Sequence, residues 1–146
     1  MGSEPVSSAP LVLDTNIVLD LFVFGDTGTQ PLQDALALGQ LDWLATPAMR
    51  DELERVLGYG HISSRLALSG QQGTDVLARF DRQVRIVEAP AKAPVTCTDP
   101  DDQKFIDLAV QHKCLLLSKD AAVLVLNRQL AAYQVSVVAA MPPTCF

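Results

Sequence analysis

The sequence predicts an α/β fold with three layers, in which helices cover both sides of a mainly parallel central sheet. Strand-like apolar runs alternate with segments of helical periodicity, as in repeated βα units. With 146 residues, the chain has the length of one domain with one core. Hydrophobic residues make up 49% of it and charged residues 19%, which favours a packed domain over a disordered chain.

The first half of the chain is expected to contain two strands and three helices. They are a strand over residues 10–13, helices over 15–25 and 30–38, a strand over 41–45 and a helix over 47–57. Pro47 suits the first position of the last helix, and Gly58 lies just beyond its end. Residues 17–24 are apolar on nearly every face, so we expect deep burial or a covering partner.

The second half begins with residues 58–73, which are rich in Gly and Ser and show no clear pattern. The elements expected after them are a helix over 74–83, a strand over 84–87, a connector over 89–98, a helix from about 101 to 112, a strand over 114–117, a helix over 121–127 and a strand over 135–138. No repeat or internal boundary is visible. We therefore expect a flexible N-terminal segment, 1–9, and a single domain, 10–146.

Two acidic residues follow predicted strands. Asp14 comes directly after the first strand, and Asp120 comes after the strand at 114–117. Ligand sites in open α/β sheets form beyond the carboxyl ends of the strands, which makes both residues candidates for a functional site. The alternative for each is a helix N-cap, a position where Asp is common. Ser118, between the strand and Asp120, can orient a water or a phosphate.

Asp102 lies in the middle of the apolar face of its predicted helix. That face is set by Phe105, Ile106 and Ala109, so the carboxylate points toward the core and needs a partner there. A capping role is again the alternative, because Asp99 and Pro100 form a typical helix start. The two interpretations are compatible, since a helix N-terminus also favours an ionised carboxylate.

Glu52 sits on the border of the apolar face of the helix at 47–57, where Leu53 and Leu57 mark that face. It is the one acid of three in this helix that can lean over the rim of a pocket. Asp51 and Glu54 point to solvent and are interpreted as a surface charge run. Helical geometry alone leaves two interpretations of Glu52 open: an acid at the rim of a pocket, or a member of the same surface charge run.

If these four acids converge, their charges repel one another by several kcal/mol in a partly buried site. The usual counter-charge for an all-oxygen site is Mg²⁺ or Mn²⁺. We therefore predict a site that binds one or two such ions and activates water to hydrolyse a phosphodiester bond of RNA, with no side-chain nucleophile. The predicted catalytic and metal-binding residues are Asp14, Glu52, Asp102 and Asp120, supported by Asn16, Asp99 and Ser118.

The net charge of −6 runs against RNA binding, because proteins that hold RNA by charge are usually basic. Bound divalent ions would reverse the electrostatic potential at the site. The lack of positive charge elsewhere predicts weak, salt-sensitive RNA binding or help from a partner. Three scattered cysteines argue against a disulfide framework and fit a reducing cytosol. The sequence contains no visible signal peptide, dinucleotide-binding fingerprint or Walker loop, and no apolar run long enough to span a bilayer.

The order of these motifs resembles the PIN-domain family. The matching segments are Leu-Asp-Thr-Asn at 13–16, an acid after a short middle strand, Asp-Pro-Asp-Asp at 99–102 followed by Gln-Lys-Phe, and Ser-Lys-Asp at 118–120. The resemblance covers residues 10–138 and is greatest to the bacterial branch of toxins from toxin–antitoxin pairs. It implies the acidic quartet named above, a hydroxyl at Ser118 and an extra acid at Asp99. It also implies Mg²⁺- or Mn²⁺-dependent ribonuclease activity, a homodimer and a small antitoxin partner, whereas the expected cytoplasmic location follows from the cysteines.

Two other functions remain open from the sequence. A receiver-like domain also uses acids at strand ends with Mg²⁺ and a Lys, but it needs paired acids after its first strand, and here Asp14 is followed by Thr15 and Asn16. A non-catalytic PIN-like module would keep the fold and bind a partner through residues 17–24. Phosphorylation by an acyl phosphate would identify the first alternative, and the absence of metal binding would favour the second.

Overall fold

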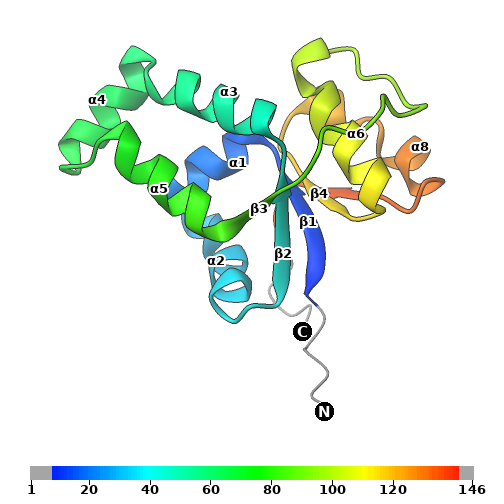
Figure 1. Ribbon diagram of the computed structural model, residues 1–146, viewed down its shortest axis with the longest axis horizontal. Helices are drawn as coiled ribbons and strands as arrows, with labels where there is room; N and C mark the ends of the chain where they lie inside the picture. Colours follow the sequence, from blue (N-terminus) through cyan, green and yellow to red (C-terminus); the bar gives the residue numbers. More distant parts are fainter. Residues whose placement is uncertain (1–7, 142–146) are drawn as a thin grey trace.

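The computed structural model describes residues 8–141, which form a five-stranded, wholly parallel sheet with helices around it (Figure 1). The strand order is β3-β2-β1-β4-β5. The strands are β1 (Ala9–Leu13), β2 (Leu41–Ala45), β3 (Val84–Ile86), β4 (Leu115–Leu117) and β5 (Ser136–Val138). This confirms the predicted three-layer α/β/α class. Ser8 is described and Ala9 already belongs to β1, whereas residues 1–7 of the predicted flexible segment lie outside the described residues.

Most helices begin or end within a few residues of their predicted bounds. The α-helices are α1 (Thr15–Leu19), α2 (Gln30–Ala37), α3 (Pro47–Leu57), α4 (Gly60–Leu68), α5 (Gly73–Gln83), α6 (Gln103–His112), α7 (Ala121–Leu124) and α8 (Asn127–Ala131). A π-helical turn, η1 (Asp20–Phe24), continues α1, and a 3₁₀ turn, η3 (Pro100–Asp102), leads into α6. None of the described helices is both long and apolar enough to cross a membrane.

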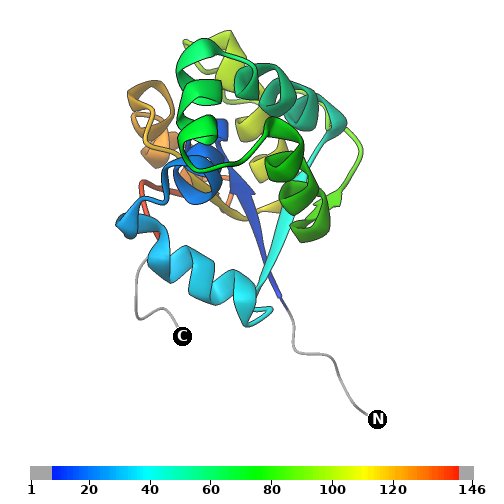
Figure 2. The same cartoon turned by 90° about the vertical axis from the view of Figure 1, so that its left-hand side faces the viewer.

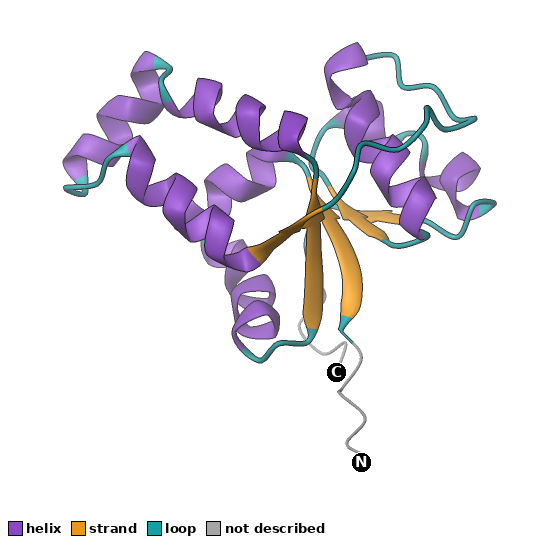
Figure 3. Cartoon of the chain, in the orientation of Figure 1, coloured by secondary structure: helices purple, strands orange, loops and turns teal. Residues whose placement is uncertain are grey.

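The connections follow from the strand order. The chain moves outward from β1 to β2 and β3, then crosses back over the sheet to β4 and β5. Because such crossovers are right-handed, this reversal places α1 and α2 on one face of the sheet and α6 on the other. Helix α6 packs against β1 and β4 (Figures 1 and 3), and Figure 2 shows α1 and α2 from the side. The point of reversal, between β1 and β4, is where open α/β sheets form their sites.

The apolar segment 17–24 was predicted to be either deeply buried or covered by a partner, and most of it is buried. In α1 and η1, the side chains of Ile17, Val18, Leu19, Leu21, Phe22 and Val23 are all buried. Phe22 lies 5.9 Å from the ring of Trp43, measured between ring centroids, and Trp43 is 2% exposed. Phe24 at the end of η1 is 38% exposed. Internal packing therefore accounts for most of this apolar segment.

Helix α4 is the main element that the sequence did not predict. It occupies most of the Gly- and Ser-rich stretch 58–73, whose intrinsic helix propensity is low. Ile62 and Leu66, one helical turn apart, are each 2% exposed, and α4 packs against η1 and α3. Burial of one apolar face thus stabilises a helix that local sequence disfavours.

Candidate metal centre

The register of β1 and β4 brings the first pair of site residues together. Leu13 lies opposite Leu117, so the next residues on the two strands, Asp14 and Ser118, leave the sheet side by side. The Ser118 hydroxyl donates a hydrogen bond to Asp14 Oδ2 over 2.7 Å. The backbone N–H of Asn16 donates to Asp14 Oδ1 over 3.2 Å. Asp14 therefore caps α1, which is one of its two predicted roles, and its place in a functional site stays a prediction.

Asp102 reaches the same region from the opposite face of the sheet. It ends η3 at the start of α6, and its side chain is buried along with those of Phe105, Ile106 and Ala109. The periodicity of α6 predicted this orientation correctly. Asp102 Oδ2 is buried and has no hydrogen-bond partner among the described residues. An unpaired buried oxygen of this kind calls for a ligand or a proton.

The connector before η3 is held in place by Gln103. The side chain of Gln103 accepts a hydrogen bond from the Cys97 backbone N–H over 2.7 Å and donates one to the Val95 carbonyl oxygen over 2.9 Å. These contacts fix the approach of the chain to Asp99, whose Oδ1 accepts from the Asp101 backbone N–H over 3.0 Å. The sequence offered no clear signal for this positioning role, because it depends on a loop without periodicity.

Three carboxylates form the tightest acidic cluster of residues 8–141. Asp99, Asp102 and Asp120 each offer one oxygen, and these oxygens all lie within 4.8 Å of one another. Asp120 also caps α7, accepting a hydrogen bond from the Ala122 backbone N–H over 2.8 Å, and its own backbone N–H donates to Ser118 Oγ over 3.1 Å. None of the ion pairs between described residues includes a member of this triad.

The acids of this cluster shift one another's pKa values upward. Burial raises the pKa of Asp102 to about 7, and the neighbouring Asp120 carboxyl, with which Asp102 can share a proton, and the charges of Asp14, Asp120 and Asp99 add to the rise. Two ionised carboxylates cannot hydrogen-bond to each other, so this contact favours the protonated form of Asp102. Burial also raises the pKa of Asp14, with smaller contributions from the charges of Asp120 and Glu52, while the hydrogen bonds from Ser118 and Asn16 oppose the rise.

Glu52 lies at the edge of the cluster and is held by two other side chains. Its Oε1 accepts a hydrogen bond from the Thr15 hydroxyl over 3.1 Å and forms an ion pair with Lys104 Nζ at 2.9 Å. Helix α3 thus leans inward at Glu52 as predicted, toward α1 and α6. Its role as a metal ligand remains a prediction, as does that of Asp14, since neither belongs to the triad.

Two neighbouring contacts were absent from the sequence prediction. Lys104 joins Glu52, and Lys119 pairs with the half-buried Asp20 of η1. Both lysines lie within two residues of a predicted acid in the chain, but their partners are distant in sequence. The side chain of Asn16 is exposed, and only its backbone contacts Asp14.

Replacing Ser118 with alanine is expected to reduce metal-dependent activity about tenfold, the usual effect of losing a group that orients a ligand. The change removes a hydrogen bond that lowers the pKa of Asp14, so that pKa should rise further. The acidic limb of the pH–activity profile should then move to higher pH. A titration of activity against pH tests this, with the exposed Ser64→Ala as control. Unchanged profiles for both variants would contradict a role for Ser118.

Comparison with known families agrees with this geometry. The chain matches the PIN domain over residues 10–122, a span that includes the carboxyl ends of β1 and β4 and every acid discussed above. A search of curated proteins found no match. PIN domains are in general metal-dependent nucleases, and the acidic triad provides oxygen ligands suited to a divalent ion. The fold, the position of the acids at the switch point and the match over most of its length together show that this chain belongs to the PIN-domain family.

Proposed function

We propose that this protein is an endoribonuclease that depends on Mg²⁺ or Mn²⁺. The observation that carries the proposal is the buried, unpaired Oδ2 of Asp102, set among carboxylates whose oxygens lie within 4.8 Å of one another. Charges this close repel, and no described cation pairs with the triad. A hard divalent cation satisfies the orphaned oxygen and removes the repulsion.

The donor set fits such an ion. Asp99, Asp102 and Asp120 would hold it, with Asp14 and Glu52 beside them. Every group is a carboxylate, and an all-oxygen site selects Mg²⁺, Mn²⁺ or Ca²⁺ over softer metals. When bound, such an ion supplies the charge that makes water an effective nucleophile at phosphorus and that stabilises the departing oxygen.

The residues of the chain itself orient the reaction. The Ser118 hydroxyl and the Asn16 backbone N–H fix the Asp14 carboxylate, which can accept a hydrogen bond from a water at the end of β1. Lys104, 27% exposed at its side chain, stands at the mouth of the site, where a substrate phosphate can draw it away from Glu52. Positioning and preorganised charge are the main contributions a protein makes to phosphoryl transfer.

Metal-dependent cleavage of RNA is the direct test. We expect single-stranded RNA to be cut with Mn²⁺ or Mg²⁺ and left intact in EDTA. Asp14→Asn should reduce the rate about 100-fold or more, which corresponds to a loss of about 2.7 kcal/mol of transition-state stabilisation. Asp51→Asn, an exposed neighbour of Glu52 on α3, serves as the matched control. Equal rates in the parent and Asp14→Asn, or full activity in EDTA, would reject the proposal.

The resemblance to bacterial toxins extends the proposal to biological role and partners. We propose that the protein is the toxin of a toxin–antitoxin pair, acts in the cytoplasm as a homodimer and is silenced by a small antitoxin protein. Production of the parent chain alone in bacterial cells should then stop growth, whereas production of Asp102→Asn should not. Normal growth at matched protein levels, together with RNA cleavage in vitro, would retain the nuclease and remove the toxin role.

A non-catalytic interaction module is the alternative. It predicts that calorimetry with Mn²⁺ shows no binding to the parent protein. The burial of residues 17–23 leaves less apolar surface for a partner than that alternative requires. A receiver-like domain would instead be phosphorylated by acetyl phosphate, and a stable acyl phosphate on Asp14 would identify it.

A further inference from the structure

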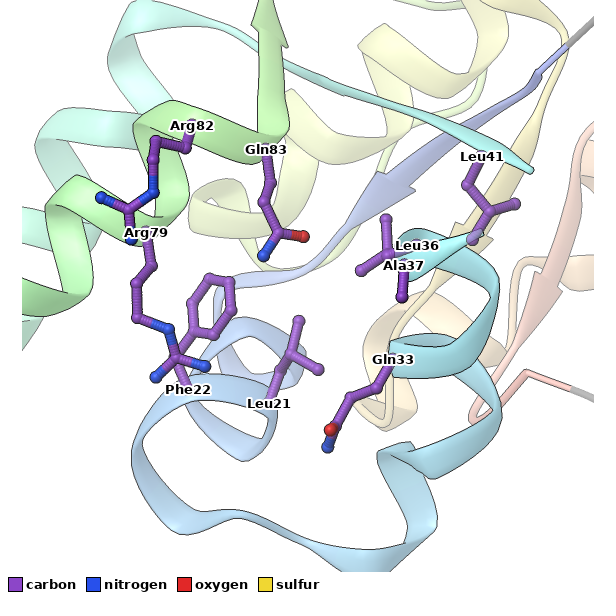
Figure 4. Close-up of a pocket in the computed structure, with 9 residues that line it drawn as sticks. All are labelled: Leu21, Phe22, Gln33, Leu36, Ala37, Leu41, Arg79, Arg82 and Gln83. Atoms are coloured by element: carbon purple, nitrogen blue, oxygen red, sulfur yellow. The ribbon is translucent and has the colours of Figure 1, made fainter. Parts of the chain in front are cut away.

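A pocket of about 390 Å³ lies between α2, η1 and α5, apart from the acidic cluster (Figure 4). Its apolar wall consists of side chains from η1, α2 and the start of β2, and its polar groups come mainly from α5. Among its lining residues are Leu21, Leu36, Leu41, Arg79, Arg82 and Gln83. A volume of this size is typical of sites for small molecules.

The pocket carries positive charge in an acidic protein. Arg79 and Arg82 line it, and none of its lining residues is acidic. The ion pairs of residues 8–141 involve other cations, so neither arginine has a carboxylate partner in that part of the chain. The Arg79 guanidinium lies 4.4 Å from the centroid of the Phe22 ring, which orders it at the edge of the pocket. With a net charge of −6 for the whole chain, this is a local reversal of sign.

Two side-chain amides add hydrogen-bonding capacity. Gln33 Nε2 donates to the Thr29 hydroxyl over 3.0 Å, which orients the amide. Gln83 makes no side-chain hydrogen bond to another described residue, and its amide points toward the space between Phe22 and Leu36 (Figure 4). An amide offers a donor and an acceptor together, the pair that matches the edge of a nucleobase.

We infer that this pocket binds a nucleotide of single-stranded RNA. The base would lie against the leucine side chains, the amides would meet its edge, and the arginines would contact the adjacent phosphate. This inference rests on the proposed ribonuclease function, because it assigns the pocket to the same substrate. The carboxylates of an acidic peptide would satisfy the arginines, but they would leave the leucine side chains and the amides of the pocket without a matching group.

The position of the pocket makes it a second contact, separate from the metal centre. Leu41, in its wall, is the first residue of β2, whereas Asp14 and Asp120 follow the carboxyl ends of β1 and β4. Strands of this length extend roughly 16 Å, so an RNA of several nucleotides is needed to contact both places. Binding here would also offset the repulsion between RNA and the acidic surface.

Fluorescence anisotropy with a labelled 12-nucleotide oligoadenylate, in EDTA to prevent cleavage, tests the inference on the full-length protein. The double variant Arg79→Ala/Arg82→Ala should bind at least tenfold more weakly. Its slope of log affinity against log salt should fall by about 0.7 for each phosphate that the variant no longer neutralises. Gln83→Ala should weaken binding without changing the slope, since it meets a base rather than a phosphate. Arg128→Ala, an exposed arginine on α8, should leave binding unchanged.

Arg79 packs on Phe22, so the exposed Arg82→Ala alone provides a variant with little risk to folding. Unchanged RNA affinity in Arg82→Ala and in a folded double variant would overturn the inference. Competition by polyglutamate but not by unlabelled oligoadenylate would also overturn it, in favour of an acidic peptide. Cleavage with Mn²⁺ is measured separately. Binding through the pocket without cleavage would refute the proposed nuclease alone, and cleavage with unaltered binding in the variants would refute the pocket alone.

Discussion

Asp102→Asn is expected to reduce metal-dependent RNA cleavage by about 100-fold or more while making the metal-free protein more stable at neutral and alkaline pH. Asp102 contributes the unpaired buried oxygen of the cluster, so its removal takes away the ligand that most needs an ion. The same carboxylate is costly to ionise without that ion, because it is buried beside Asp120, Asp14 and Asp99. Function and stability should therefore change in opposite directions.

The size of the stability gain follows from the pKa of Asp102, which is raised from 3.8 to about 7. Each pKa unit corresponds to about 1.4 kcal/mol, so the gain in free energy of unfolding should be of the order of a few kcal/mol at about pH 8. Urea unfolding in EDTA and cleavage with Mn²⁺ measure the two effects. Asp101→Asn, exposed on the same turn, is the matched control and should change neither. A variant that is both active and no more stable than the parent would contradict the assigned role of Asp102.

The metal-free protein is expected to lose stability as the pH rises from about 4 to about 7. Below the unfolded-state pKa of 3.8, Asp102 is protonated whether the chain is folded or not. Between that value and about 7, the folded chain keeps a proton that the unfolded chain releases, so raising the pH favours unfolding. The raised pKa of Asp14 acts in the same direction. The hydrogen bond from Arg50 lowers the pKa of Asp81. This group therefore affects the stability only below about pH 4, where its protonation favours unfolding.

Divalent ions should reverse this trend. Protons and metal compete for the same carboxylates, so Mn²⁺ should raise the melting temperature more at about pH 8 than at about pH 5. Thermal melts at both pH values, with EDTA or Mn²⁺, measure the effect. Asp102→Asn separates the titration of Asp102 from the general charge repulsion of an acidic chain. In EDTA, the melting temperature of this variant should fall less with rising pH than that of the parent. An equal shift by Mn²⁺ at both pH values would mean that the ion binds elsewhere.

Much of the fold is encoded in local patterns. The alternation of apolar runs and helical periods predicted the order of the strands along the chain, and β2 and α3 have the predicted bounds. Helix α4 was missed because its stability comes from burying Ile62 and Leu66 against distant segments. The helix predicted over 121–127 ends at Leu124, and α8 follows separately with Leu130 buried. Packing of this kind leaves little trace in a short window of sequence.

The candidate site divides in the same way. Helical periodicity predicted that Asp102 faces the core, and its side chain is buried. The strand ends predicted that Asp14 and Asp120 lie at the carboxyl end of the sheet, where they follow the neighbouring strands β1 and β4. The sequence suggested a supporting role for Asp99, whereas the structure includes it in the tight triad. It offered Glu52 as an equal member, whereas the structure pairs it with Lys104 and Thr15.

The sequence by itself determined the class of fold, the end of the sheet that carries the acids and the kind of chemistry that carboxylates at such an end favour. Those features follow from periods of two and 3.6 residues and from the residue types at strand ends, all of which act over a few positions. Only the tertiary structure decided which oxygens meet, which acids receive a lysine and where two arginines line a pocket. Distances of a few ångströms between side chains on separate elements depend on how the whole core packs, and no local pattern specifies that packing.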